Sequence, residues 1–193
     1  KKIKVIGIVK GYKKNLINFK NVKYFVNKNY KKNDQLDSLI TAKKFLISDT
    51  IVSFSDIIYD EKILNPILKD SSPISIAIDY KWKKKYLNRF DHPFSQADKV
   101  QIKNNKIVKI GKDLPLKKTN AEFLGIMKIS KDFIKFFFKE YELIKKNKQS
   151  MQIHNFIQHL INRNIEVNYS KVSGKYMEID TFNDYMIAKD IFK

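Results

Sequence analysis

The 193-residue chain contains no cysteine, and only two of its 39 basic residues, Arg89 and Arg163, are arginines. The absence of cysteine excludes a disulfide framework, a thiolate metal site and a thiol nucleophile. It also fits a reducing compartment, so we expect a cytoplasmic protein, although other settings would tolerate the same composition.

Long apolar runs are absent as well. A membrane-spanning helix needs about 18 consecutive apolar residues, and the longest candidate, 133–138, is interrupted by Lys135. The basic start at Lys1–Lys4 is followed by too short an apolar stretch for a signal peptide. The sequence therefore predicts neither a membrane span nor a secretion signal.

What the chain has in excess is positive charge, +19 at neutral pH. Such a charge often indicates nucleic-acid binding. Proteins that read bases and phosphates rely on the planar fork of arginine, however, and here the charge comes from lysines spread along the whole chain. A dedicated nucleic-acid surface is not favoured, and the charge could instead attract a small polyanionic substrate.

The order of apolar patterns predicts one α/β domain over residues 1–193. Strand-like runs alternate with helical spacings, and two short runs joined by Lys103-Asn104-Asn105-Lys106 predict an antiparallel hairpin. We expect a mostly parallel, Rossmann-like sheet flanked by helices, with that hairpin inserted. The expected strands are 3–9, 22–26, 50–56, 74–79, 100–102, 107–110, 123–129, 165–167 and 176–180, and the main expected helices are 37–45, 61–68, 154–162 and 181–192.

Two aspartates stand at the ends of apolar runs far apart in the chain. Asp56 ends the run 50–56, and Asp180 ends the run 176–180. Open α/β sheets bind ligands at the carboxyl ends of their strands, and one or two carboxylates plus phosphate oxygens are typical ligands of Mg²⁺. If the two acids meet, they could hold a magnesium ion over a nucleotide. The alternative is that each caps the helix that follows it.

The pieces occur in an order that resembles a known family. In chain order they are Ile8-Val9-Lys10-Gly11-Tyr12, Asn27, Ser38-Leu39, Ser53-Phe54-Ser55-Asp56-Ile57, Ile78-Asp79, Ile110-Gly111-Lys112, Glu122-Phe123-Leu124-Gly125, Gly174 to Thr181, Asp184 and Ala188. This series resembles the sugar-phosphate nucleotidyltransferase-like (nucleotide-diphospho-sugar transferase-like) fold, and within it the cytidylyltransferases that activate phosphocholine or 2-aminoethylphosphonate.

The resemblance implies transfer of CMP from CTP to a phosphocholine-like or phosphonate acceptor, with release of pyrophosphate. It makes Asp56 and Asp180 the catalytic pair and the ligands of Mg²⁺. Members of this family begin with a glycine-rich strand and loop that carry an Arg and a Lys. The chain starts at Lys1, after that region, so we expect an N-terminally truncated domain whose activity requires the missing segment.

Further residues are candidates for substrate contacts. Lys112 and Glu122 match the family's pattern around the acceptor pocket, and Glu178 alternates with Asp180 in a strand and so faces the same side. Ser38 is expected near a helix start, where its hydroxyl could meet the nucleotide or could simply cap the helix.

The polar, aromatic segment 80–96 is expected to form a loop or lid. Trp82 could bind an ammonium group through its ring face or could pack into the core. Lys81 could contact a phosphate or phosphonate. Arg89 could bind substrate or pair with Asp91.

Other functions stay open at this point. A sugar-1-phosphate nucleotidyltransferase would have the same fold, and a basic module that binds polyanions without chemistry would explain the charge. The three histidines show no zinc-ligand spacing. The oligomeric state is open, with a homodimer among the alternatives.

Overall fold

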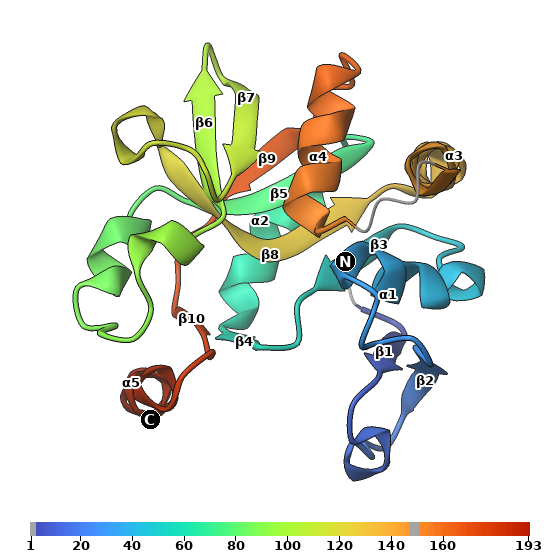
Figure 1. Ribbon diagram of the computed structural model, residues 1–193, viewed down its shortest axis with the longest axis horizontal. Coiled ribbons are helices and arrows are strands. Elements are labelled where there is room, and N and C mark those ends of the chain that lie inside the picture. Colours follow the sequence, from blue (N-terminus) through green and yellow to red (C-terminus); the bar gives the residue numbers. More distant parts are fainter. Residues whose placement is uncertain (1–2, 147–150) are drawn as a thin grey trace.

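The computed structural model describes residues 3–146 and 151–193 of the chain. A central sheet lies at the middle of the molecule, and two projections extend below it in Figure 1, one with α5 and β10 and the other with β1 and β2. Lys1, the expected start of a truncated domain, lies outside the described residues.

The described chain alternates strands with α-helices and short 3₁₀ helices, labelled η. The strands are β1 (Ile6–Lys10), β2 (Val22–Val26), β3 (Thr50–Ser53), β4 (Ile57–Tyr59), β5 (Ile74–Asp79), β6 (Lys99–Lys103), β7 (Lys106–Gly111), β8 (Ala121–Ile129), β9 (Asn168–Lys171) and β10 (Tyr176–Glu178). The α-helices are α1 (Gln35–Thr41), α2 (Leu64–Lys69), α3 (Ile134–Lys146), α4 (Ile153–Asn162) and α5 (Phe182–Ile191). The 3₁₀ helices are η1 (Lys14–Leu16), η2 (Lys43–Phe45), η3 (Glu61–Ile63), η4 (Trp82–Tyr86), η5 (Phe94–Gln96), η6 (Leu116–Lys118) and η7 (Lys131–Phe133).

The central sheet has the strand order β7-β6-β8-β5-β9, and β3 pairs with β8 beside this path. The α/β class is confirmed, but the strand directions differ from the expected mostly parallel sheet. β8 runs antiparallel to β3, β5 and β6, whereas β9 is parallel to β5. Parallel neighbours need a crossover connection, and among these strands only β9 is reached through a pair of α-helices, α3 and α4.

Other boundaries match or shift by a few residues. The strands predicted at 22–26 and 74–79 have the same bounds in the structure, and the predicted hairpin is formed by β6 and β7. Its turn residues Asn104 and Asn105 have φ angles of +49° and +58°, as a type I′ turn requires. The predicted strand 165–167 is wrong. These residues form no strand in the structure; Ile165 and Val167 pack on the core, and β9 begins only at Asn168.

Two apolar layers hold the sheet, because residues alternate between its faces. On β5, Ile74, Ile76 and Ile78 face the larger core with α3 and α4, while Ala77 faces the smaller core with α2. The rings of Phe137 on α3 and Phe156 on α4 lie 4.7 Å apart between centroids. Among the described residues, no helix combines the length and apolar character that a bilayer crossing requires.

Gly125 lies where β8 changes its partner from β6 to β3. Its φ is +69°, and a Cβ added there would lie 2.5 Å from Cδ2 of Phe54. The pairing of β5 with β8 shifts register between Ile76 and Ile78, opposite this position. A β-bulge at a glycine therefore bends the central strand and makes room for the Phe54 ring.

Replacement of Gly125 by alanine should lower the free energy of unfolding by about 1–3 kcal/mol, because it adds both a strained φ and a clash with Phe54. Gly111→Ala is the matched control, since Gly111 has a φ of +155° but an added Cβ would meet nothing within 4 Å. Urea unfolding measures both variants. Equal losses in the two variants would contradict a packing role for Gly125.

Candidate active site

β4 and β10 form a two-stranded antiparallel ribbon that brings the two predicted acids together. Glu178 pairs with Ile57, and one position further the Ile179 N–H donates to the Asp56 carbonyl at 2.7 Å. Asp56 and Asp180 therefore lie on neighbouring segments, and both side chains reach solvent. Partial burial raises the pKa of Asp56, and the negative charge of Asp180 raises it further.

The alternative that both aspartates are helix caps is wrong. Asp56 is followed by β4 rather than a helix, and the N-cap of α5 is Thr181, not Asp180. Thr181 and Asp184 form a capping box, in which the Thr181 hydroxyl accepts from Asp184 N–H and the Asp184 carboxylate accepts from Thr181 N–H. The carboxylates of Asp56 and Asp180 are thus not used as caps.

Arg89 is buried and connects the segment 80–96 to the acids. Its Nε donates to Asp184 Oδ1 at 2.6 Å, and its Nη2 donates to the Glu178 carbonyl at 3.2 Å. The partner of Arg89 is thus Asp184, not the Asp91 considered from the sequence. Burial alone would raise the pKa of Asp184, but the hydrogen bond and charge of Arg89 hold it at about 2. The pair fixes the backbone on both sides of Asp180.

Glu178 and Glu122, two predicted substrate contacts, lie beside this pair. Burial, followed by repulsion from Asp180 and Glu122, raises the pKa of Glu178 to about 8. Burial raises the pKa of Glu122 to about 7, although the Tyr86 hydroxyl donates a hydrogen bond to it. Asp180, Glu178 and Glu122 therefore form a cluster of acidic side chains that extends from the exposed Asp180 toward the interior.

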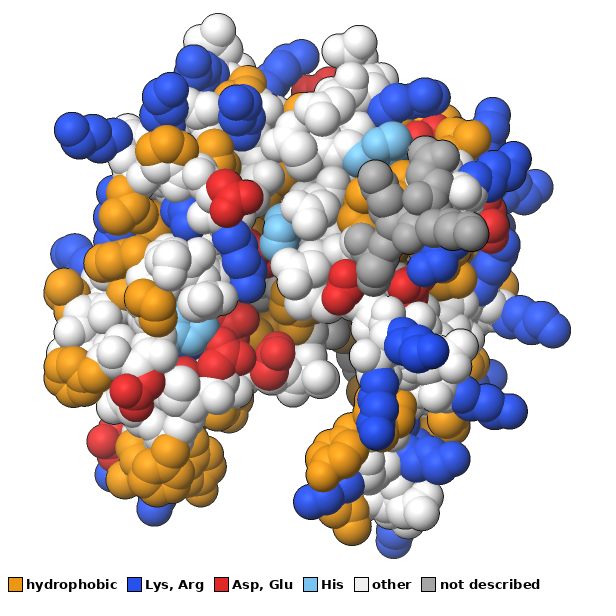
Figure 2. Space-filling view, viewed as in Figure 1, with side chains coloured by type: hydrophobic (Ala, Val, Ile, Leu, Met, Phe, Trp, Pro, Cys, Tyr) orange, Lys and Arg blue, Asp and Glu red, His pale blue; other side chains and the backbone are white. Residues whose placement is uncertain are grey.

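His92 belongs to the same group, although its position was not anticipated. Its Nδ1 lies 3.0 Å from Asp180 Oδ2, and its Nε2 lies 3.9 Å from Glu178 Oε2. The sequence spacing of the histidines gave no signal, because the partners of His92 are almost 90 residues away in the chain. The polar composition of 80–96 was the only indication. Figure 2 shows acidic side chains gathered next to a histidine, beside the hollow between the two projections.

Lys81 and Lys112 lie at the edge of this region. Lys81 is exposed just after β5, and its backbone N–H donates to Asp79 Oδ1 at 2.7 Å. Lys112 Nζ donates to Gln96 Oε1 at 3.4 Å, and its charge acts on His92. The charge of Lys112 thus reaches the group from the side of the segment 80–96, whereas Lys81 contacts Asp79 through its backbone.

Trp82 and Ser38 are placed differently from the expectation. Trp82 is 0% exposed and packs edge-on against Tyr86 and Phe94, and the Lys83 amine lies 5.8 Å from its ring centroid, so the ring is closed to the ammonium group of a ligand. Ser38 lies in the middle of α1, where its hydroxyl accepts from the Asn27 amide at 3.1 Å. α1 lies beside β1 and packs on the α3–α4 side of the molecule, away from α5 and β10, so Ser38 is not part of the acidic group.

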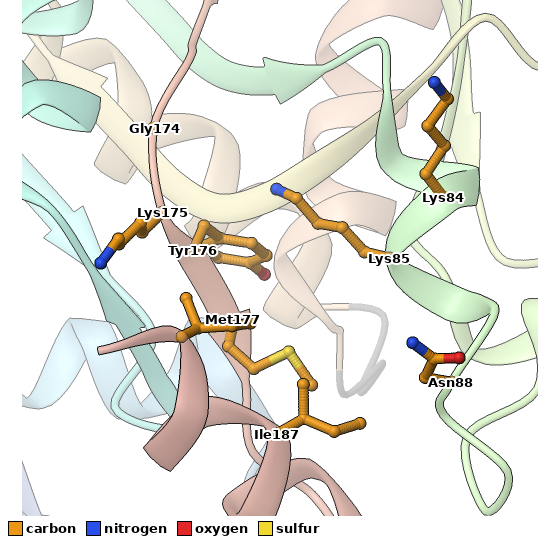
Figure 3. Close-up of a pocket in the computed structure, with 9 residues that line it drawn as sticks. Lys84, Lys85, Asn88, Gly174, Lys175, Tyr176, Met177 and Ile187 are labelled. Carbon is orange, nitrogen blue, oxygen red and sulfur yellow. The ribbon is translucent and has the colours of Figure 1, made fainter. Parts of the chain in front are cut away.

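A separate cavity of about 330 Å³ lies between η4, β10 and α5. Figure 3 shows its lining, with Lys85 directed toward the ring of Tyr176 and with Met177 and Ile187 below them. The Lys85 amine is bound to Asp79 Oδ2 at 2.7 Å and lies 4.8 Å from the Tyr176 ring centroid. Lys85 thus joins the cavity to the polar network of the site.

No protein-family model matches the chain. The CTP:phosphoglutamine cytidylyltransferase of Campylobacter jejuni is 26% identical over 201 residues, which cover 94% of this chain and 79% of that protein.

Two solved structures share the fold. The inositol-1-phosphate CTP transferase from T. maritima has a TM-score of 0.70 and 19% identity, with 98% of this chain and 76% of that chain covered. The CTP:phosphocholine cytidylyltransferase from Streptococcus pneumoniae has a TM-score of 0.71 and 16% identity, with 98% and 78% covered. The resemblance seen in the sequence is confirmed: the chain has the nucleotidyltransferase fold, and its sequence is similar to that of a protein named as a CTP:phosphoglutamine cytidylyltransferase.

Proposed function

We propose that this protein is a cytidylyltransferase that moves CMP from CTP to an oxygen of a small phosphorylated or phosphonate acceptor and releases pyrophosphate. The observation that carries the proposal is the meeting of Asp56 and Asp180 across the β4–β10 ribbon. The sequence relationship to a protein named as a CTP:phosphoglutamine cytidylyltransferase supports the choice of CTP.

The residues present fit the magnesium ion that the fold family implies. Asp56 and Asp180 offer carboxylate oxygens, which Mg²⁺ prefers. Their mutual repulsion, which contributes to the raised pKa of Asp56, is what a divalent cation would relieve. When bound, Mg²⁺ would neutralise negative charge on the phosphate oxygens of CTP.

The chain's own residues would position the reactants. The acceptor oxygen attacks the α-phosphorus as the bond to pyrophosphate breaks, so no covalent enzyme intermediate is needed. Lys81 and Lys112 would bind phosphate oxygens at the rim. Glu122 and Glu178 would surround the body of the acceptor, and Arg89 holds the backbone of Glu178 in place. Because Trp82 is buried, its ring does not support a phosphocholine acceptor over the others.

The test is Mg²⁺-dependent binding of CTP to the full-length protein, measured by isothermal titration calorimetry. Asp56→Ala and Asp180→Ala should each weaken CTP binding in Mg²⁺ at least about tenfold, because each removes one proposed metal ligand. Asp190→Ala is the control, since Asp190 is exposed and pairs only with Lys193 among its described contacts.

Two outcomes would contradict the proposal. One is CTP binding that is unchanged in both aspartate variants. The other is salt-sensitive binding to any polyanion regardless of these substitutions, which would support the basic binding module instead.

A further inference from the structure

The projection that contains β1 and β2 carries positive charge only. Its residues 3–33 include nine lysines and no aspartate or glutamate. The lysines are Lys4, Lys10, Lys13, Lys14, Lys20, Lys23, Lys28, Lys31 and Lys32, and all except Lys10 are exposed. In Figure 2 this projection lies at the lower right, and no acidic side chain is visible at its end. The projection is therefore a cationic surface without acidic residues of its own.

An open cavity of about 560 Å³ lies at the carboxyl ends of β1 and β2. The two strands are parallel and in register from Ile6 with Val22 to Lys10 with Val26, so they end side by side. Lys13 and Lys14, which follow β1, and Lys28, which follows β2, line the cavity. This edge of parallel strands is where open α/β sheets bind ligands, and the lysines suit an anionic one.

The backbone around this cavity is held in place. A Cβ added to Gly11 would lie 2.7 Å from Cβ of Tyr30, so the tyrosine packs directly on the glycine. Asn27 is buried, and its Oδ1 accepts from the backbone N–H of Asn29 at 3.0 Å. Lys13 has a φ of +44°, a conformation that costs energy for a residue with a side chain and that often marks a functional site.

Apolar side chains lie beside the lysines on the same connection between the strands. Leu16 is 77% exposed, Tyr12 is 67% exposed and Phe19 is 64% exposed. Leu16 also lines the cavity. In Figure 1 this connection forms the lower end of the projection. A group of large exposed apolar side chains among polar ones indicates an interaction surface.

The combination of charges and apolar groups narrows the choice of partner. In a symmetric contact, a second copy of this chain would bring the same lysines, and like charges repel. Single-stranded nucleic acid stacks its bases on aromatic rings, but Leu16, the most exposed of the three apolar residues, has no ring. An anionic phospholipid bilayer offers phosphates for the lysines and an apolar interior for Leu16 and Phe19.

We propose that residues 3–33 form a docking surface for an anionic phospholipid bilayer. Leu16 and Phe19 enter the interface between headgroups and acyl chains, and Lys13, Lys14 and Lys28 bind lipid phosphates. Binding of this kind increases with the apolar area buried and with the attraction of lysines to anionic lipids. The proposal concerns the β1–β2 projection alone and does not depend on CMP transfer.

The experiment is sedimentation of the untagged full-length protein with vesicles of equal parts phosphatidylcholine and phosphatidylglycerol, and with vesicles of phosphatidylcholine alone. The wild-type protein should bind the mixed vesicles at least about tenfold more tightly. Lys13→Gln with Lys14→Gln should weaken that binding about 25-fold, because each lysine near an anionic surface contributes about fivefold. Leu16→Gln should weaken it about fivefold, because it removes an apolar side chain from the interface.

η6 provides matched controls outside the projection, since it lies between β7 and β8 of the central sheet. Lys117 and Lys118 are exposed and adjacent in sequence like Lys13 and Lys14, and Leu116 is 41% exposed. Lys117→Gln with Lys118→Gln removes the same charge from the protein, and Leu116→Gln removes the same apolar group. Both should leave vesicle binding within about twofold of wild type.

Three results would overturn the inference. The first is wild-type binding that is no tighter to the mixed vesicles than to phosphatidylcholine. The second is an equal loss in the projection and η6 variants, which would mean that only the total charge matters. The third is a loss in the lysine variant with none in Leu16→Gln, which would indicate a site for free phosphate or nucleic acid instead. Thermal unfolding shows that each variant compared is folded.

Discussion

Asp180→Asn should reduce kcat/KM for CTP-dependent transfer by about 100-fold or more. The substitution keeps the size of the side chain but removes the negative charge that would hold the divalent cation at the phosphates. Metal neutralisation contributes several kcal/mol to such reactions, and each 1.36 kcal/mol corresponds to tenfold in rate. Pyrophosphate release by the full-length protein measures the effect, with phosphocholine, 2-aminoethylphosphonate and phosphoglutamine supplied in parallel as acceptors.

Asp56→Asn should give a loss of similar size, because the same ion would lose its other carboxylate. Asp190→Asn removes an exposed carboxylate on the same helix that follows Asp180 and should leave kcat/KM within about twofold of wild type. An Asp180→Asn protein with activity close to wild type would show that this carboxylate does not take part in the transfer.

The second large effect is expected at the buried ion pair. Arg89→Met should lower the free energy of unfolding by about 3–5 kcal/mol, because it leaves the Asp184 carboxylate, 0% exposed, without its cation. Lys193→Met removes one side of an exposed pair, whose partners are 68% and 70% exposed, and should cost less than about 1 kcal/mol. Denaturant unfolding of the two variants compares the buried pair with the exposed one.

The pH dependence of stability follows from the same pair. The pKa of Asp184 falls from 3.8 to about 2 in the folded protein. This pair therefore stabilises the fold above pH 3.8, and its contribution is lost as the pH falls toward 2. In Arg89→Met that contribution is absent, so the wild-type advantage should shrink steadily on acidification in this range.

A double variant, Arg89→Met with Asp184→Asn, should regain part of the lost stability. An unchanged unfolding free energy in Arg89→Met would contradict a structural role for the pair.

Local patterns in the sequence were enough to predict the elements that depend on them. The alternation of β-branched residues gave β2 and β5 their bounds, and the paired asparagines gave the β6–β7 turn. The meeting of Asp56 and Asp180 was also predictable, because each acid closes an apolar run and the ordered series resembles a known family.

The rest depends on contacts that no local pattern encodes. Arg89 and Asp184 are 95 positions apart, and nothing near either residue specifies the other. The same holds for His92 and Asp180. The polar composition of 80–96 predicts a loop, but Trp82, Tyr86 and Phe94 of this segment pack together, and this packing buries Trp82. Strand direction escaped prediction as well, because it follows from how the connections run in space.

The carboxylate of Asp184 has consequences for how this protein can change over generations. It serves the start of α5, the backbone amide of Asp180 and the guanidinium of Arg89 at once. No single replacement of Asp184 preserves all three hydrogen bonds, so we expect Arg89 and Asp184 to be kept together or to change together among homologues. Replacement of an exposed lysine breaks no such buried network, so substitutions on the lysine-rich exterior should cost far less stability than a change at either of these two residues.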